Sequence, residues 1–298
     1  MSDHLRQVRV VDVFTDKALA GNQLAVVLDG RDMPADLMQK IAREMNFSET
    51  TFILPPVDPS HAARVRIFNP EYEMKFAGHP TIGTAWVMHT EGLVESLQFT
   101  LEEGVGPVAV RGVSVDGGVQ FWMSHPPLKF GDVHPHAKIA TALGIDPSDI
   151  VHDIPAQDVK TGSTFLFVVL RDAAAVDKAT SDRARITQLL QRRDSTGVYL
   201  FAAVGANRLY GRMFAADVSE DPATGSAAGP LGGFAVRYGL VRRAPKVSIV
   251  VEQGTKMGRQ SFIHVELEYS DGDETPSRIE VGGSVMPVLS GTLADFGS

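Results

Sequence analysis

Two segments rich in small residues occur at matching places in the two halves of the chain. They are GHPTIGTAWVMHTEGLV, at residues 78–94, and GSAAGPLGGFAVRYGLV, at residues 225–241. Gly78 therefore corresponds to Gly225, 147 positions later, which is about half of the 298 residues. Both segments are apolar almost all round, and a helix of that kind is buried on every side. The sequence thus predicts two buried helices, each inside its own layer of strands.

Two further matches support a duplicated unit. The same offset places SETTFIL (48–54) on STGVYLF (195–201), and both segments follow a helix-like stretch. In the same order along the chain, EEGVG (102–106) resembles EQGTKMG (252–258). A single match of this length arises by chance, but three matches in one order favour a repeat.

Each half reads as strands, an amphipathic helix, more strands, the small-residue helix and a closing hairpin. In the first half the amphipathic helix is expected at 36–45. We predict an α+β fold of two similar domains, 1–124 and 125–298, each a β-barrel-like mixed sheet wrapped around a central helix. The C-terminal strand is a candidate to cross back to the first domain.

Composition narrows the classes of protein. The net charge of −8, with no basic stripe, argues against a nucleic-acid partner. No apolar run approaches the roughly 18–20 residues that span a bilayer, and the polar start is unlike a signal peptide. The chain has no cysteine, which excludes disulfides, thiolate catalysis and cysteine metal sites. We expect a cytoplasmic protein with no membrane partner.

The starts of the two small-residue helices are candidate ligand sites. A helix N-terminus presents unpaired backbone N–H groups and a partial positive charge, and so attracts anions. Gly78 and Gly225 begin the two helices and are predicted to bind a small carboxylate. The alternative is ordinary capping, in which Thr224 or Ser226 satisfies the end of the second helix.

Three titratable residues lie near these starts. His79 follows Gly78, Asp221 precedes the second helix, and Glu49 stands between a helix and an apolar strand. Burial of Glu49 would raise its pKa, which prepares a carboxyl group for general acid/base work near neutral pH. A lone histidine or aspartate is more often structural, and spacing alone does not show that the three converge.

Metal and nucleotide signals are weak in this sequence. HPH (134–136) has no third ligand nearby and is predicted to be a surface loop. AGHPTIGT lacks the Gly-Lys-Ser/Thr ending of a phosphate-binding loop, and no dinucleotide motif occurs. We therefore predict that the protein needs no metal and no cofactor.

Five motifs together resemble the PhzF phenazine-biosynthesis family. They are DVFTDKALAGNQLAVVLDG, NFSETTFI, RIFNPEYEMKFAGHPTIGTAWV, EDPATGSAAGPL and EQGTKMGRQS, and the resemblance runs from about residue 8 to about residue 291. The family has the diaminopimelate epimerase fold. This resemblance implies two similar domains with the substrate site between them, in agreement with the repeat.

The resemblance also implies roles for individual residues. Glu49 matches the family's catalytic glutamate, which shuttles a proton. His79, Asp221 and Ser226 match residues that bind and orient the substrate. Asn22 matches the asparagine of the usual Gly-Asn-Pro turn, but Gln23 replaces the proline here, so the rigidity of that turn is in question.

Related epimerases and racemases use two cysteines, at positions that match Ala77 and Thr224 here. With no cysteine, two-thiol racemisation is excluded. One acid that removes and returns a proton favours isomerisation, with a shifted double bond. We expect a cofactor-independent isomerase of a small carboxylate, of the type that isomerises trans-2,3-dihydro-3-hydroxyanthranilate. The alternatives are a non-catalytic carboxylate-binding protein and an epimerase or lyase that uses the same acid.

A homodimer is also expected. The expectation comes partly from the family and partly from the β-rich closing segments, whose exposed strand edges need cover.

Overall fold

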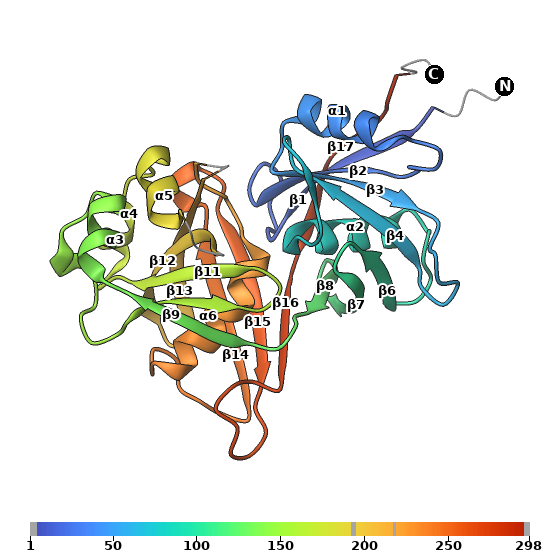
Figure 1. Cartoon of the computed structure of the whole chain (residues 1–298). Helices are drawn as coiled ribbons and strands as arrows, with labels where there is room; N and C mark the ends of the chain where they lie inside the picture. Colours follow the sequence, from blue (N-terminus) through green and yellow to red (C-terminus); the bar gives the residue numbers. More distant parts are fainter. Residues whose placement is uncertain (1–4, 192–194, 217–218, 295–298) are drawn as a thin grey trace. The chain divides into compact units, whose positions relative to one another are not determined.

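A computed structural model describes residues 5–191, 195–216 and 219–294 of the chain. The chain forms two compact units (Figure 1). The first unit contains the chain up to Ser124 and is completed by the stretch that begins at Gly282. The second unit is His125–Val281. Each unit is described separately below.

The first unit is a mixed sheet that surrounds one helix. Its strands are β1 (Gln7–Val13), β2 (Asn22–Val27), β3 (Glu49–Leu54), β4 (Ala63–Phe68), β5 (Glu73–Met74), β6 (Gln98–Glu103), β7 (Gly106–Val115), β8 (Gly118–Ser124) and β17 (Val285–Thr292). Its helices are α1 (Ala35–Met45) and α2 (Gly78–Thr90). The last strand of the chain, β17, pairs antiparallel with β1 and so completes this sheet.

Strands β1, β2 and β3 of the first unit are buried on both faces. Val10, Ala25 and Val27 pack with the apolar side of α1. The alternate residues face the other way: a Cβ atom added to Gly83 of α2 would lie 2.5 Å from Leu24 and 2.8 Å from Val13. This period of two explains why VRVVDV and LAVV are nearly continuous apolar runs. Gly83 is required because α2 lies too close to the sheet for a larger side chain.

The second unit repeats this architecture. Its strands are β9 (Lys129–His134), β10 (Ala156–Lys160), β11 (Thr164–Val169), β12 (Ser195–Gly205), β13 (Arg208–Ala215), β14 (Lys246–Gln253) and β15 (Ser261–Glu268), with β16 (Arg278–Gly283) at its end. Its helices are α3 (His136–Leu143), α4 (Ala173–Lys178), α5 (Arg183–Leu190) and α6 (Gly225–Arg237). Short 3-10 turns occupy Pro147–Asp149 and Thr255–Met257.

The core of the second unit also has two sides. Leu166, Val168, Val198 and Leu200 pack with α3, α4 and α5. Aromatic residues on the opposite face of the strands surround α6. The ring of Phe234, which belongs to α6, lies 5.6 Å from the ring of Phe167 and 6.0 Å from the ring of Phe201. The central helix is therefore buried by large side chains of the strands, and its own small residues allow their approach.

The order of strand pairing confirms the duplication that the sequence predicts. In the first unit β2 and β3 are parallel, β3 and β4 antiparallel, and β4 and β6 parallel. In the second unit β11 and β12 are parallel, β12 and β13 antiparallel, and β13 and β14 parallel. The central helix connects the second parallel pair in both units. The predicted α+β fold, with two mixed sheets around central helices, is therefore confirmed.

The repeated Gly-Leu-Val sequence ends both central helices. Gly92 has φ of 69° and Gly239 has φ of 71°, a backbone conformation that glycine adopts without steric cost. The next residues turn back: Leu93 N–H donates to the Met88 carbonyl, and Leu240 N–H to the Ala235 carbonyl. The two helices thus begin and end at matching residues.

One local prediction for the second unit fails. HPH at 134–136 is not a surface loop, because His134 ends β9 and His136 begins α3, with Pro135 as its N-cap. His134 lies 2.6 Å from Asp158, and both side chains are largely buried. The sequence does not indicate the short helices α3 and α4, since each has at most eight residues and little periodic pattern.

In the parts of the chain that the structure describes, no helix has the length and apolar character that crossing a membrane requires.

Candidate active site

The first group of candidate residues lies where β2, β3 and α2 all begin. Glu49 is the first residue of β3 and stands opposite Leu24 of the parallel strand β2. His79 is the second residue of α2 and is buried. Its Nε2 atom lies 3.3 Å from Oε2 of Glu49 and 3.2 Å from the carbonyl oxygen of Gln23. The structure therefore brings Glu49 and His79 together.

The Gln23 carbonyl orients the histidine. Gln23 follows Asn22, which is buried at the start of β2. A backbone carbonyl only accepts a hydrogen bond, so the Nε2 atom of His79 carries the proton. The replacement of the family's proline by Gln23 leaves this carbonyl in place, because it belongs to the backbone.

His79 is a neutral imidazole. Burial lowers the pKa of His79 from 6.5 to about 3, and the hydrogen bond to Gln23 opposes this only partly. The 3.3 Å approach of its Nε2 atom to Oε2 of Glu49 is therefore the approach of a neutral ring to a carboxyl group and is not an ion pair.

A stability measurement checks the charge state of His79. Between pH 6.5 and about 3 the unfolded chain binds a proton at His79 that the folded chain does not bind. Stability therefore falls as pH falls through this window, by up to about 1.4 kcal/mol per pH unit for one proton. We expect the His79→Gln variant to show a shallower acid dependence of its urea midpoint. A slope equal to that of the wild type would contradict a neutral, buried His79.

The second group of candidate residues lies at the start of α6. Asp221 is 8% exposed, and its N–H donates to the Met213 carbonyl at 3.1 Å. Thr224 Oγ1 donates to Oδ2 of Asp221 at 2.6 Å. The Thr224 side chain therefore does not cap α6, and the N-cap residue of α2, Ala77, has no side chain that could. The capping alternative is wrong for Thr224.

A buried glutamine supports Asp221 from behind. Gln253 is fully buried, and its Nε2 donates to the Asp221 carbonyl at 2.7 Å and to Thr224 Oγ1 at 2.9 Å. Its Oε1 accepts from Tyr199 Oη at 2.8 Å and from the Thr224 N–H at 3.1 Å. Burial raises the pKa of Tyr199, so its hydroxyl keeps the proton that it donates. All four hydrogen-bonding positions of the Gln253 amide are used.

A glycine allows this arrangement. Gly254 has φ of 77°, and a Cβ atom there would lie 2.5 Å from the Pro222 carbonyl and 2.3 Å from that of Arg259. The EQGTKMG motif therefore serves to bring Gln253 against the segment that carries Asp221.

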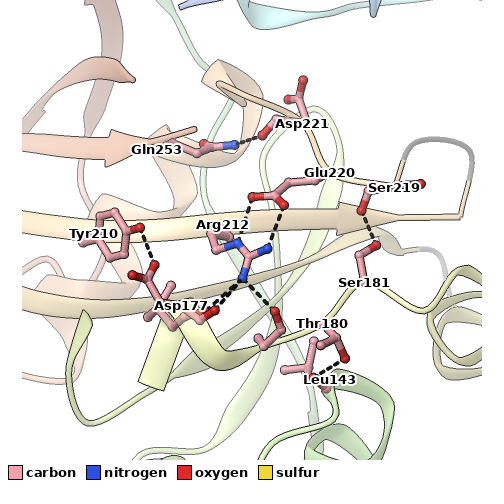
Figure 2. Close-up of polar contacts among 12 residues, drawn as sticks. Leu143, Asp177, Thr180, Ser181, Tyr210, Arg212, Ser219, Glu220, Asp221 and Gln253 are labelled. Atoms are coloured by element: carbon pink, nitrogen blue, oxygen red, sulfur yellow. Dashed lines mark hydrogen bonds and ion pairs between the residues drawn. The ribbon is translucent and has the colours of Figure 1, made fainter. Parts of the chain in front are cut away.

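A buried ion pair fixes the residue before Asp221. Arg212 of β13 makes two hydrogen bonds of 2.8 Å to the Glu220 carboxylate, and its Nη1 donates to the Ala179 carbonyl at 2.7 Å. Figure 2 shows the Glu220 carboxylate facing Arg212 and the Asp221 carboxylate facing elsewhere. Such a two-pronged contact sets the orientation of the carboxylate plane as well as its position.

The other predicted binding residues occupy the helix starts. Gly78 and Gly225 are the first residues of α2 and α6, and Ser226 follows as a partly exposed residue. Ala77 and Thr224, which match the cysteines of related epimerases, are the two N-cap residues.

Sequence reasoning missed the supporting residues Tyr199, Arg212 and Gln253. A charged Arg212 inside the apolar run LYGRMFA was the one signal available for it, since buried charges are usually paired. Among the residues that the structure describes, no group of three or more metal-ligating side chains occurs. The need for no metal or cofactor stays a prediction.

Two mixed sheets built around central helices, with an acid beside a neutral histidine at the first helix start, define the class of protein. The chain is an α+β protein with a diaminopimelate epimerase-like fold.

Comparisons with known proteins give the family. The family model for phenazine biosynthesis-like proteins, PhzC-PhzF, matches residues 11–291. The chain therefore belongs to this family and is an isomerase of the PhzF type. The chain is 35% identical to an uncharacterized isomerase of Mesorhizobium japonicum, over 97% of this chain and 98% of that relative.

Two further relatives support the assignment. A trans-2,3-dihydro-3-hydroxyanthranilate isomerase of Pseudomonas fluorescens is 34% identical, over 95% of this chain and 98% of that protein. The crystal structure of a Bacillus anthracis phenazine biosynthesis protein of the PhzF family has a TM-score of 0.87 at 23% identity, over 99% of this chain and 100% of the other. The last likeness shows the fold.

Proposed function

We propose that this protein is a cofactor-independent isomerase of a small carboxylate, in which Glu49 moves one proton. The observation that carries the proposal is the contact of Glu49 with His79. An acid at the start of a strand, next to a neutral buried N–H donor, has the arrangement of a positioned general acid/base.

The proposed step conserves all atoms and electrons. The Glu49 carboxylate removes a proton from one carbon of the substrate, and the neighbouring double bond moves. Glu49 then returns the proton to the carbon at the far end of the three-carbon unit. One C–H bond breaks and one forms, so the step needs neither an oxidant nor a second substrate. His79 stays neutral beside the Glu49 carboxyl group throughout.

The substrate class follows from the relatives. Because a relative at 34% identity is named trans-2,3-dihydro-3-hydroxyanthranilate isomerase, that compound is the first candidate substrate. The proposal assigns substrate binding to Asn22, Gly78, Asp221, Gly225 and Ser226. Asp221 suits an amine or hydroxyl donor of the substrate, and the helix starts suit its carboxylate.

The experiment that tests the function is turnover of trans-2,3-dihydro-3-hydroxyanthranilate by purified protein, with the product identified by NMR. We expect a shifted double bond, with no added cofactor and in the presence of a chelator. An inverted stereocentre or a lost fragment would instead support the epimerase or lyase alternative. Binding without turnover of this compound and of its close analogues would support the binding-protein alternative.

The homodimer stays a prediction, for which sedimentation at micromolar concentration is the test.

The Asp221→Asn variant tests the binding role. The amide keeps an oxygen for the hydrogen bond from Thr224 but removes the charge that a substrate donor would meet. Hydrogen bonds to charged groups contribute about 1.5–3 kcal/mol, so we expect KM to rise by about tenfold or more, with a smaller change in kcat. An unchanged KM would exclude Asp221 from substrate binding.

A further inference from the structure

Glu103 is a buried acid that the proposed reaction does not use. It is the last residue of β6 and is 7% exposed. Its Oε1 lies 2.6 Å from Thr81 Oγ1, and Thr81 Oγ1 also lies 2.8 Å from the carbonyl oxygen of Ala77. Its Oε2 has no hydrogen-bond partner among the described residues. The Thr81 hydroxyl therefore has two oxygen neighbours at hydrogen-bonding distance.

Counting protons assigns the charge state of this group. A hydroxyl has one proton to donate, and the Ala77 carbonyl only accepts. The Thr81 proton therefore goes to Ala77, and the contact with Glu103 needs a proton from Glu103. If Glu103 were ionised, one of the two contacts would bring oxygen lone pairs together with no proton between them. Both contacts are satisfied only when Glu103 is a neutral acid.

The surroundings of Glu103 agree with this assignment. Burial raises the pKa of Glu103 from 4.5 to about 8 and outweighs the stabilisation that the Thr81 hydroxyl would give to the ionised form. The ionisable groups on neighbouring elements include Arg64 and Arg66 of β4, Arg111 of β7, Lys75 before α2, Glu102 of β6 and His79 of α2. Within the described part of the chain, none of them forms an ion pair or a hydrogen bond with the Glu103 carboxyl group.

We propose that neutral Glu103 is a positioning residue for His79. Glu103 donates to Thr81, and Thr81 donates to Ala77, so that β6 is tied to the first turn of α2. Ala77 is the N-cap residue of that helix and His79 is its second residue. His79 must keep Nε2 close to both Gln23 and Glu49, and a shift of the helix start would move it. The catalytic consequence rests on the proposed function, whereas the hydrogen-bonded chain does not.

The test follows the ring nitrogens of His79 by 15N NMR in the wild type, Glu103→Gln and Glu103→Ala. His79→Asn identifies the signals, because it removes them. In the wild type we expect the His79 signals to move as pH rises through about 8, where Glu103 loses its proton. Glu103→Gln has an amide N–H that donates to Thr81 at every pH, so its signals stay at the wild-type position with no such step. In Glu103→Ala they are displaced at all pH values.

Glu102→Gln is the matched control. Glu102 precedes Glu103 but accepts from the N–H groups of Val57 and Asp58 and does not contact Thr81. The Glu102→Gln variant should therefore still show the change of the His79 signals near pH 8. Wild-type signals that do not change through pH 8, or a Glu103→Gln variant that still shows the step, would overturn the proposal. If Glu103→Ala does not fold, the comparison of the wild type with Glu103→Gln still decides.

Turnover provides a second readout. With a substrate, kcat should fall above about pH 8 in the wild type and not in Glu103→Gln. Glu103→Ala should lower kcat by about tenfold to a hundredfold at every pH, since small displacements of catalytic groups have effects of this size. A protein that turns over no substrate contradicts the isomerase proposal, whereas the NMR result decides the role of Glu103 by itself.

Discussion

Replacing Glu49 with glutamine lowers kcat by about 10²–10⁴-fold and changes substrate affinity much less, because general acid/base catalysis contributes about this factor. Glutamine keeps the size and the hydrogen-bonding capacity of the side chain. It cannot take up and return a proton. Steady-state kinetics with the cognate substrate, together with calorimetric binding to the variant, separates the two effects.

The matched control for this variant is Glu44→Gln. Glu44 is exposed on α1, on the same stretch of chain, and has no part in the candidate site. Its replacement should leave kcat and KM at wild-type values. A Glu49→Gln enzyme with wild-type kcat would remove Glu49 from the chemistry and favour a different acid.

Replacing Arg212 with methionine lowers the free energy of unfolding by about 3–5 kcal/mol, the usual effect of removing one partner of a buried ion pair. Methionine fills much of the same volume but leaves the Glu220 carboxylate, 13% exposed, without its cation. The Ala179 carbonyl also loses the hydrogen bond from Arg212, while the Val176 carbonyl still accepts from the Ala179 N–H. Chemical denaturation at neutral pH measures the change.

Two further variants make this prediction specific. Adding Glu220→Gln to Arg212→Met should restore part of the stability, because it removes the buried charge that the first change leaves unpaired. Arg66→Met removes an equally short Arg66–Glu73 pair, whose glutamate is 42% exposed, and should cost no more than about 1 kcal/mol. Equal losses for Arg212→Met and Arg66→Met would mean that burial does not set the strength of the Arg212–Glu220 pair.

The fold was largely predictable because a buried helix places strong limits on sequence. A helix such as GSAAGPLGGFAV has no polar face, so other elements must surround it. Two such helices at matching places in the two halves therefore each need their own layer of strands. The turn at Gly92 and Gly239 adds a second matching point in each half. The boundary between the two units was harder to predict, because β17 pairs with β1 across 283 positions of sequence, as between Val8 and Gly291. No local pattern encodes such a pairing.

The sequence indicates the titratable residues of the candidate site but not the residues that support them. Glu49, His79 and Asp221 stand out because each is a titratable residue at the edge of an apolar element. Residues that act through others give no such signal. Gln253 of β14 and Tyr199 of β12 lie near Asp221 only because of the way these strands are arranged in the fold. Glu103 likewise lies near the start of α2 only because β6 lies beside that helix. Glutamine and tyrosine in strands are also common without any such role.

The most direct test of the account follows the proton itself. A substrate labelled with deuterium at the carbon that loses its proton is converted by the wild-type enzyme, and the product is analysed by NMR at early times. If Glu49 removes and returns the same proton, part of the deuterium appears at the carbon where the new C–H bond forms. Because the Glu49 carboxyl group is only 13% exposed, the deuterium that it carries exchanges slowly with solvent. Product with no transferred deuterium, together with normal turnover by Glu49→Gln, would contradict the account.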